Sequence, residues 1–304
     1  MSLRPLFVCL PGAEHLIQRL ADGLNGEIAR MQFRAFPDGE SYVRFETTPM
    51  NRTVVLVANL KDPDAHLLRL FFTSAAARAQ GARRIGLIAP YLPYLRQDRA
   101  FHPGEAVSAR HICTLLSALA DWLVTLDPHL HRIDRLARIL DIPSRTARSA
   151  SLLADWIRAR FERPVIIGPD AESRRWVVEI ANQLTAPALI LTKQRLDDGA
   201  VRLQTDRLRD LGTRTPIIVD DILSTGGPLC AVITALKAAG ARPPVCAIIH
   251  ALGDEAAETR LLKAGARQLV TTNSTRSGPG CVDITPPLIA KANTLLTPAF
   301  PPDR

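Results

Sequence analysis

The sequence predicts an α/β protein made of two doubly wound domains, each with a mostly parallel sheet. Three observations predict this class: short apolar runs alternate with longer helical patterns, turn residues bound the apolar runs, and one helix-strand segment occurs twice. The length of 304 residues fits two domains, because single cores stop growing near ~250 to 300 residues. Strands are expected at residues 53–59, 84–89, 122–127, 165–168, 188–192, 216–220, 245–251 and 268–272.

The repeated segment predicts an internal duplication. The stretch AAARAQGARRIGLIAPYL, beginning at Ala75, resembles TALKAAGARPPVCAIIHAL, beginning at Thr234. Each consists of a helix, an A-x-G-A-R connection and a buried strand. Further on, LVTLDPH at 123–129 aligns with LVTTNST at 269–275. Chance similarity between alanine-rich helices is the alternative explanation.

The domain boundary is predicted where Pro143 and a run of small residues interrupt the pattern, at 142–152. We therefore predict an N-terminal α/β domain at residues 1–145 and a C-terminal α/β domain at 146–304. A helix between the first two expected strands is apolar on more than one face, as expected for a helix packed on a sheet. Its apolar residues are Leu67, Leu68, Leu70, Phe71 and Ala75.

The composition is typical of a soluble globular protein and excludes a disordered chain, because 47% of the residues are hydrophobic and 22% are charged. No apolar run approaches the ~20 residues that cross a bilayer, so we expect no membrane segment and a cytoplasmic location. Five cysteines, an odd total without a C-x-x-C pair, indicate free thiols rather than disulfides or a zinc site.

The formal charge of +8 comes from 33 arginines and only 5 lysines, and the planar guanidinium suits phosphate binding. One basic cluster is dense enough to bind a polyanion. A solvated helix or a subunit contact is favoured for it, and no nucleic acid is expected, because no stacking aromatics interleave with the basic residues. The cluster consists of His131, Arg132, Arg135, Arg138, Arg145 and Arg148.

Charged or metal-capable residues follow four of the expected strands. In open parallel sheets, ligands bind beyond the carboxyl ends of the strands. His129 follows one strand, Asp170 a second and Lys193 a third, while Asp220 and Asp221 close a fourth. These strand ends are therefore the expected ligand site.

The segment IIVDDILSTGGPL, at 217–229, carries the strongest signal. A buried strand places two consecutive carboxylates at its end, and Ser-Thr-Gly-Gly then turns into a helix that starts near Leu229. Glycines let the backbone approach an anion, hydroxyls add donors, and free N–H groups at the helix start complete a phosphate cradle. Because carboxylates accept hydrogen bonds from ribose hydroxyls, this pattern predicts a sugar-phosphate site. A simple capped helix would not explain the two adjacent acids.

This segment closely resembles the 5-phosphoribosyl 1-diphosphate binding motif shared by phosphoribosyltransferases and ribose-phosphate pyrophosphokinases. Three further matches, and the two-domain organisation, favour the pyrophosphokinase family. FPDGE at 36–40 looks like the loop that meets the adenine of ATP from a neighbouring subunit, and RQDR at 96–99 looks like the ATP-contacting segment. KQR at 193–195 resembles the K-x-R of the mobile catalytic loop. The resemblance extends over residues 6–296.

The resemblance implies two domains of type I phosphoribosyltransferase fold, and transfer of the β,γ-diphosphoryl group of Mg-ATP to the 1-hydroxyl of ribose 5-phosphate. It also implies a homo-oligomer, either a dimer or a hexamer of dimers. Implied catalytic residues are Lys193 and Arg195, and implied Mg²⁺ contacts are His129, where His131 competes for the role, and Asp170. Implied sugar-phosphate contacts are Asp220, Asp221, Ser224, Thr225, Gly226, Gly227, Pro228 and Leu229. Implied nucleotide contacts are Phe36, Asp38, Gly39, Glu40, Arg96, Gln97 and Asp98.

The chain departs from the family pattern in three places. Ser224 stands where better known bacterial members have Asp, and Glu172 lies in a segment that is usually small and glycine-containing. Pro228 replaces a Thr whose hydroxyl and N–H would meet the 5-phosphate, and proline has neither donor. Two other functions remain open: a phosphoribosyltransferase, which needs no ATP segments, and a non-catalytic member of the same family.

Overall fold

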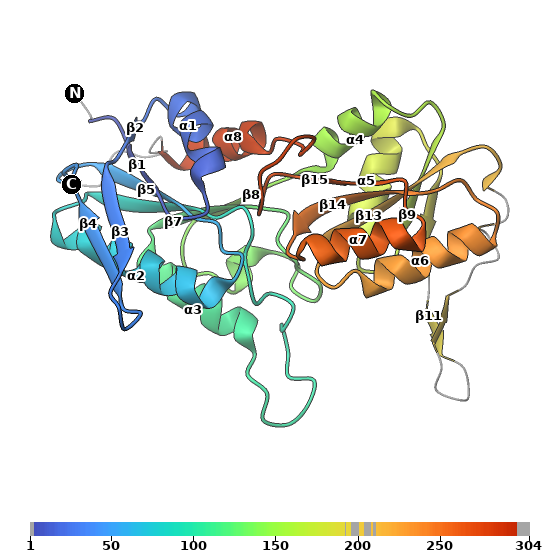
Figure 1. Ribbon diagram of the computed structural model, residues 1–304. Coiled ribbons are helices and arrows are strands. Elements are labelled where there is room, and N and C mark those ends of the chain that lie inside the picture. The colour runs from blue at the N-terminus through green and yellow to red at the C-terminus, as the bar shows by residue number, and fades with distance from the viewer. Residues whose placement is uncertain (1–2, 192, 196–200, 204–207, 209–210, 297–304) are drawn as a thin grey trace. The chain divides into compact units, whose positions relative to one another are not determined.

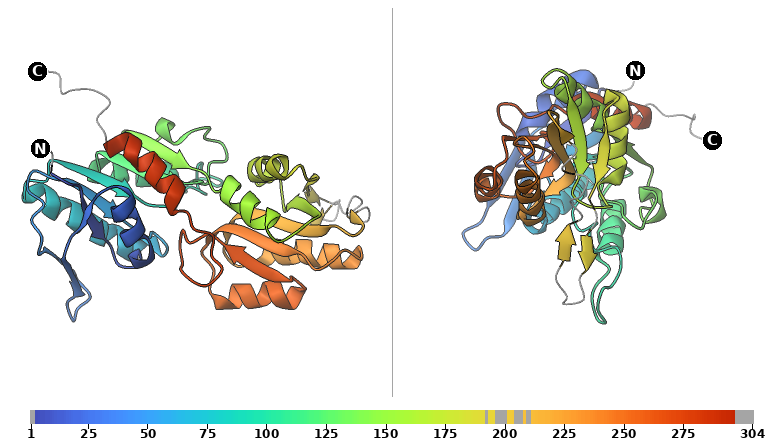
Figure 2. Two further views of the ribbon diagram at one scale, coloured as in Figure 1. Left: turned by 90° about the horizontal axis from the view of Figure 1, so that it is seen from above. Right: turned by 90° about the vertical axis from the view of Figure 1, so that its right-hand side faces the viewer.

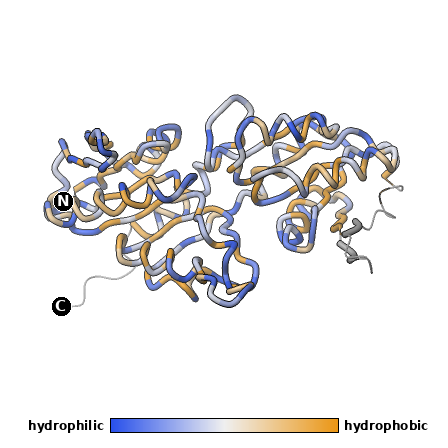
Figure 3. Tube along the Cα trace, turned by 60° about the horizontal axis from the view of Figure 1, so that its bottom comes forward, coloured by the Kyte–Doolittle hydropathy of each residue, from blue (hydrophilic) through white to orange (hydrophobic). Residues whose placement is uncertain are grey.

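The computed structural model describes residues 3–191, 193–195, 201–203, 208 and 211–296, and it divides into two compact units (Figure 1). The first unit combines residues 1–148 with the C-terminal segment from Thr285, and the second comprises Ser149–Ile284. In the hydropathy view of Figure 3, hydrophobic stretches run through the interior of each unit. Each unit therefore has its own sheet and core.

The first unit is a six-stranded parallel sheet with helices on both faces (Figure 1). Helices α1 and α8 lie on one face, and α2 and α3 on the other. The sheet has the order β2-β1-β5-β6-β7-β8. The strands are β1 (Leu6–Cys9), β2 (Glu27–Ile28), β5 (Thr53–Val57), β6 (Arg84–Ile88), β7 (Trp122–Leu126) and β8 (Ser144–Ala147); the helices are α1 (Glu14–Gly23), α2 (Pro63–Ala79), α3 (Ser108–Leu119) and α8 (Thr285–Leu296). A separate antiparallel hairpin is formed by β3 (Met31–Ala35) and β4 (Ser41–Phe45).

The second unit is a five-stranded parallel sheet of the order β10-β9-β13-β14-β15. Helices α4 and α5 contact each other on one face, and α6 and α7 on the other. A short antiparallel pair, β11 (Lys193–Arg195) with β12 (Val201–Leu203), stands apart from the sheet. The strands are β9 (Pro164–Gly168), β10 (Ala188–Ile190), β13 (Thr215–Leu223), β14 (Val245–Ala251) and β15 (Gln268–Thr271); the helices are α4 (Ala150–Arg158), α5 (Arg174–Leu184), α6 (Gly227–Ala238) and α7 (Glu255–Ala264).

The two sheets confirm the predicted fold class and the duplication. If β6 is matched to β14, as the repeated segment indicates, the neighbours β2-β1-β5-β6-β7 correspond one by one to β10-β9-β13-β14-β15. In both units an antiparallel hairpin, β3–β4 or β11–β12, precedes the central strand β5 or β13. All eight expected strands are present. The inner strands β5, β6, β7, β9, β13 and β14 are mostly buried, as expected for parallel strands covered on both faces, whereas the edge strands β10 and β15 are only partly buried.

The structural division differs from the predicted domains in one respect. The boundary lies at 148/149, close to the predicted 145/146, but α8 packs on the first unit against α1, β7 and β8. Figure 2 shows α8, in red, beside α1, in blue. The buried side chains of α8 include Leu288, Ala292 and Leu295, so its apolar face completes the core of the first unit although it follows the second unit in sequence.

The apolar pattern of α2 predicted a helix packed on the sheet, but the helix does not bury all of its apolar residues. Leu70 is fully buried, whereas Leu68, Phe71 and Phe72 are 49%, 44% and 38% exposed. Only one face of α2 therefore packs on the sheet, and the other presents an apolar surface, here called the α2 patch (Leu68, Phe71 and Phe72).

The five cysteines are free thiols, as expected. Burial raises the pKa of Cys9 and Cys113 to about 11 and that of Cys246 to about 12. Among the described residues, no helix has both the length and the apolar composition that a membrane span requires.

Candidate active site

The acidic pair lies within strand β13 rather than at its end. β13 continues to Leu223, where the sequence predicted an end at Asp220, because its last residues still pair with β14. Pairing with the neighbouring strand β9 stops at Ile218. Successive residues of a strand point to opposite faces, and Asp221 is only 5% exposed while Asp220 is half-buried. The two carboxylates therefore occupy different environments.

The segment predicted to be a phosphate cradle forms a short turn between β13 and α6; it is called the cradle below. Gly226 has φ +80°, a left-handed conformation that suits glycine, and it precedes the first helical residue, Gly227. The first intrahelical bond is donated by the N–H of Cys230 to the carbonyl of Gly226, at 2.9 Å. Pro228 lies in the first turn, and no acidic residue is present there. The helix start is thus a site of positive partial charge without a competing carboxylate.

Three residues that the sequence did not point to hold this turn in place. The N–H groups of Leu252 and Gly253 both donate to the carbonyl of Leu223, each at 2.8 Å, and Nε of Arg260 donates to the carbonyl of Thr225 at 3.0 Å. A Cβ on Gly253 would lie 2.3 Å from the carbonyl oxygen of Ser224. Gly253 therefore allows the loop after β14 to touch the cradle. The only sequence signal for it is a glycine soon after a buried strand.

Asp170 lies in the turn between β9 and α5, at the same edge of the sheet as the cradle. Its Oδ1 accepts hydrogen bonds from the N–H groups of Glu172 at 3.0 Å and Ser173 at 3.4 Å, while the hydroxyl of Ser173 donates to its carbonyl at 2.7 Å. Gly168 has no room for a Cβ, which would lie 2.3 Å from Ser173 Oγ. These bonds place a carboxylate next to strand β13, which carries the acidic pair.

The predicted catalytic pair, Lys193 and Arg195, belongs to the short strand β11. The backbone of Lys193 pairs with Leu203 and that of Arg195 with Val201. The side chains of both, and the residues at 196–200, lie outside the described part of the structure.

The predicted nucleotide loop at 36–40 is the exposed tip of the β3–β4 hairpin. The N–H of Phe36 donates to the carbonyl of Glu40 at 2.8 Å, and Gly39 has φ +92°. The guanidinium of Arg34 lies over two rings, 4.7 Å from the centroid of Phe36 and 4.2 Å from that of Tyr42. The tip is thus an ordered aromatic and cationic projection, with Asp38 Oδ1 accepting from the N–H of Glu40 at 3.2 Å.

The second nucleotide segment, Arg96, Gln97 and Asp98, lies in the loop that follows β6. The side chain of Asp98 is only 2% exposed. It accepts a hydrogen bond from the guanidinium of Arg132 at 2.8 Å and another from the backbone N–H of Arg132 at 3.2 Å. Gln97 Oε1 accepts from the hydroxyl of Ser108 at 3.1 Å, while Arg96 is exposed. Asp98 therefore joins the loop after β6 to the loop after β7, where the half-buried His129 lies.

Several residues of the predicted basic cluster are engaged by neighbours. Besides Arg132, Arg138 forms an ion pair with Asp134 at 2.8 Å, and Arg145 donates to the carbonyl of Ser144 at 3.0 Å. Arg132, Arg138 and Arg145 therefore each have a partner within their own unit; the solvated helix or subunit contact expected for the cluster stays a prediction.

The structure gathers the predicted residues in two groups, each within one unit. Asp170, the acidic pair and the cradle lie at the carboxyl edge of the second sheet. The loop at 96–98 and His129 follow adjacent strands of the first sheet, and the hairpin tip is a separate projection of that unit. No described cluster of three or more His, Cys, Asp or Glu residues is suited to hold a metal ion by itself.

Comparisons with known proteins cover nearly the whole chain. A family model described as the N-terminal domain of ribose phosphate pyrophosphokinase matches residues 6–119, and a phosphoribosyl transferase domain model matches residues 136–282. A ribose-phosphate pyrophosphokinase of Methanopyrus kandleri is 36% identical over 281 residues, which are 91% of this chain and 95% of that protein. One of Sulfolobus acidocaldarius is 32% identical, with coverage of 84% and 88%. The crystal structure of phosphoribosylpyrophosphate synthetase from Mycobacterium smegmatis superposes with a TM-score of 0.82 at 24% identity, over 97% of this chain and 99% of that one, and so supports the fold.

Proposed function

Because the chain belongs to the ribose-phosphate pyrophosphokinase family, we propose that it transfers the β,γ-diphosphoryl group of Mg-ATP to the 1-hydroxyl of ribose 5-phosphate. The family makes the chain a transferase, as the sequence predicted, and a phosphoribosyltransferase is not favoured because the N-terminal pyrophosphokinase domain is present as well. The observation that carries the proposal is the β13–α6 turn. There an acidic pair is followed by the start of a helix whose first turn contains no acidic residue.

Ribose 5-phosphate is proposed to bind along this turn. The phosphate would accept hydrogen bonds from the hydroxyls of Ser224 and Thr225 and from the N–H groups that begin α6, which have no intrahelical acceptor. Asp220 and Asp221 would accept from the ribose hydroxyls. Of the two, half-buried Asp220 has the more accessible carboxylate, and Asp221 is only 5% exposed.

The transfer itself requires positioning and charge neutralisation. The 1-hydroxyl attacks the β-phosphorus, the bond from that phosphorus to the α-phosphate oxygen breaks, and AMP leaves. Lys193 and Arg195 are proposed to neutralise the charge of the transferring group. The hairpin β11–β12, which carries both residues, stands apart from the sheet, as suits a segment that closes over a substrate.

The carboxylates at this edge fit a magnesium ion. Mg²⁺ takes oxygen ligands, keeps several waters, and is usually bound by one or two carboxylates together with substrate phosphates rather than by a full protein cage. Asp170 provides an oxygen donor that its turn already holds in place. We propose that Asp170 would hold a hydrated Mg²⁺ ion, and that His129 would contact Mg²⁺ through water or phosphate. The bound ion supplies charge neutralisation of the triphosphate.

ATP is proposed to contact the first unit, and the active enzyme to be a homo-oligomer in the cytoplasm. Arg96 is exposed on the loop after β6, and the tip at 36–40 presents Phe36 beside the guanidinium of Arg34. The α2 patch adds three exposed large apolar side chains on one helix, which suit contact with a second copy of the chain.

An assay for AMP release tests the proposed reaction. We expect AMP to form from ATP only when ribose 5-phosphate is present, and in equal amount to phosphoribosyl diphosphate. Ribose without the phosphate is the matched control substrate and should give no AMP. Consumption of phosphoribosyl diphosphate with a nucleobase, without AMP release from ATP, would instead identify a phosphoribosyltransferase. No turnover in either assay would identify the non-catalytic member.

A further inference from the structure

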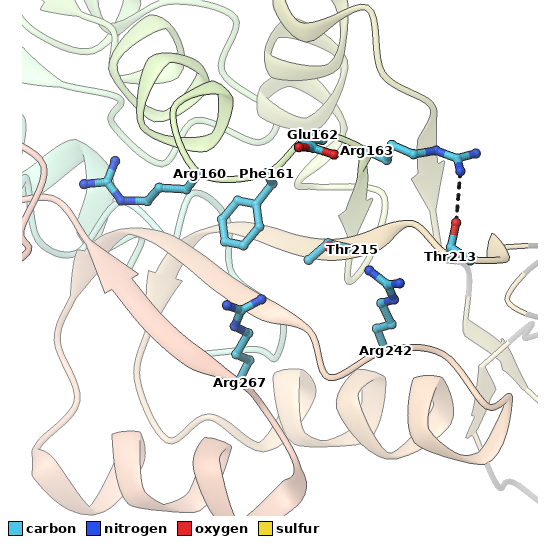
Figure 4. A pocket seen from close by; sticks show the side chains of 8 residues that line it. All are labelled: Arg160, Phe161, Glu162, Arg163, Thr213, Thr215, Arg242 and Arg267. Atoms are coloured by element: carbon cyan, nitrogen blue, oxygen red, sulfur yellow. Dashed lines mark hydrogen bonds between the residues drawn. The ribbon is translucent and has the colours of Figure 1, made fainter.

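A pocket of the second unit lies at the edge of the sheet opposite to the cradle. It is formed where β9, β13, β14 and β15 begin, whereas the cradle lies where they end. At ~3.3 Å per residue, the 9 residues of β13 separate the two edges by roughly 25 to 30 Å. The cavity has a volume of about 360 Å³ (Figure 4). It is lined by Arg160, Phe161, Glu162, Arg163, Thr213, Thr215, Arg242 and Arg267 and is here called the strand-start pocket.

The parallel topology brings these cations together. Parallel strands begin at a common edge, so the residues just before neighbouring strands come close although they are far apart in sequence. Arg163 immediately precedes β9, and its carbonyl accepts from the N–H of Thr215, the first residue of β13, at 2.9 Å. Arg267 immediately precedes β15, and its N–H donates to the carbonyl of Pro244 at 2.7 Å. The backbones that carry the arginines are thus fixed by the sheet.

The side chains leave positive charge directed into the cavity. In Figure 4, Arg242 and Arg267 point toward the space beside Thr215, while Arg160 points away. The guanidinium of Arg160 lies 4.7 Å from the Trp156 ring, so it is occupied elsewhere. Arg163 donates to Thr213 Oγ1 at 3.0 Å, which brings a hydroxyl to the rim.

Within the described part of the chain, the arginines of this cavity form no ion pair with a carboxylate. The ion pairs found there do not include Arg163, Arg242 or Arg267, although Glu162 lines the same cavity. Three exposed guanidinium groups around one cavity repel one another, and a bound anion removes that repulsion. Each planar guanidinium also matches a phosphate with two parallel hydrogen bonds.

We propose that the strand-start pocket binds a phosphate or diphosphate group, held by Arg242 and Arg267 and bordered by Arg163 and the hydroxyls of Thr213 and Thr215. The volume is at the low end of the ~300 to 1,000 Å³ of small-molecule sites, which suits a compact anion. The Phe161 ring does not offer a free stacking face, because Arg267 lies 5.6 Å from its centroid and Trp156 is tilted against it at 5.9 Å. The contacts therefore favour a small phosphoryl anion over a single-stranded nucleic acid.

Equilibrium dialysis with radiolabelled inorganic diphosphate tests the site by counting bound anions per chain. The double variant Arg242→Ala/Arg267→Ala should bind one anion fewer than the wild type, with at least about a hundredfold weaker binding at the lost site if each contact contributes about tenfold. The matched control is Arg83→Ala, since the repeat G-A-R places Arg83 before β6 as it places Arg242 before β14, but in the first unit. It should bind as many anions as the wild type.

Counting sites separates this proposal from the proposed function, because diphosphate bound at the active site remains in all three proteins. Competition identifies the chemistry: inorganic phosphate and a nucleoside diphosphate should both displace the label from this site, and the nucleoside alone should not. An equal number of sites in the double variant and the wild type, displacement by the nucleoside alone, or tighter binding of a single-stranded oligonucleotide than of diphosphate would each overturn the proposal. Thermal melting of both variants verifies that they are folded.

Discussion

The turn from β5 to α2 in the first unit corresponds, in the duplicated fold, to the turn from β13 to α6 in the second. Both helices begin after a residue with left-handed backbone, Asp62 with φ +54° and Gly226 with φ +80°, and both have a proline in the first turn. The first turn of α2 contains Asp64, whereas the first turn of α6 contains no acid. A carboxylate near a helix start interacts favourably with the same positive partial charge that attracts a phosphate.

The first unit uses that carboxylate to hold its own structure. Asp64 accepts a hydrogen bond from the hydroxyl of Tyr94, in the loop after β6, and this bond raises the pKa of the tyrosine to about 12. The comparison teaches that two helix starts of similar geometry can differ by one side chain: the first unit has an acidic residue in this turn, and the second has none. The predictions below test how far the two units have diverged.

The largest expected effect concerns the hairpins β3–β4 and β11–β12, which occupy the same place in the two units. If the tip at 36–40 serves the active site of a neighbouring copy, the monomer should lose essentially all activity. We expect the activity per chain to fall when the protein is diluted. In the double variant Phe71→Glu/Phe72→Glu, which alters the α2 patch, both dissociation and the loss of activity should occur at higher protein concentrations than in the wild type. Sedimentation and steady-state assays measure these in parallel.

Leu262→Glu is the matched control for that double variant, because Leu262 is also an exposed apolar residue, 45% accessible, but lies on α7 of the second unit. It should dissociate as the wild type does. A monomer with full activity would show that each copy is self-sufficient and that the two hairpins do not share one active site between chains.

The second hairpin is expected to act mainly in the transition state. Lys193→Ala should lower kcat by at least ~100-fold with a much smaller change in KM, which corresponds to loss of one charge contact of ~3 kcal/mol. Lys263→Ala, at the last turn of α7, removes a lysine without a proposed role and should leave kcat unchanged. An unaltered kcat in Lys193→Ala would remove this residue from the mechanism.

The features predicted best from the sequence are those formed by contiguous residues. Buried strands such as β14 are unbroken apolar runs, and the cradle is a single segment, so both were predictable. Seven of the described strands were missed, namely β1, β2, β3, β4, β8, β11 and β12. β1 is buried but only four residues long, β3 is largely exposed, and β11 consists of Lys-Gln-Arg, without a hydrophobic pattern. The end of β13 was placed too early, since carboxylates normally mark a strand end and here the pairing with β14 continues past them.

Support of the site by distant residues could not be predicted. Arg260 contacts Thr225 across 35 positions, and the contact of Gly253 with Ser224 requires two loops to meet. The assignment of α8 to the first unit depends on packing between segments at opposite ends of the chain. Such pairings exist only once the sheet order is known.

Gly253→Ala tests that support. The added Cβ would lie 2.3 Å from the carbonyl oxygen of Ser224, a backbone atom that yields only if the cradle moves. We expect a rise in KM for ribose 5-phosphate of about tenfold, equivalent to ~1.4 kcal/mol, with a smaller change in KM for ATP. Gly278→Ala, where an added Cβ meets nothing within 4 Å, is the control and should behave as the wild type. Equal effects of the two substitutions would contradict a role for Gly253 in shaping the cradle.

The smallest expected effect concerns Pro228, the residue that departs most from the family pattern at the cradle. A threonine there adds an N–H and a hydroxyl, and each charge-assisted bond to a phosphate is worth roughly 1.5 to 3 kcal/mol. Only a several-fold decrease in KM for ribose 5-phosphate is expected from Pro228→Thr, because Arg260 already brings a guanidinium to the loop through its bond to Thr225. Proline also suits the first turn of a helix, so its removal costs some rigidity.

In an Arg260→Ala background the gain from Pro228→Thr should be larger, and KM for ATP should change little in either background. If Pro228→Thr weakens binding of ribose 5-phosphate instead, the turn is shaped around proline for a different ligand, and the difference between the α2 and α6 turns would not be one of phosphate binding.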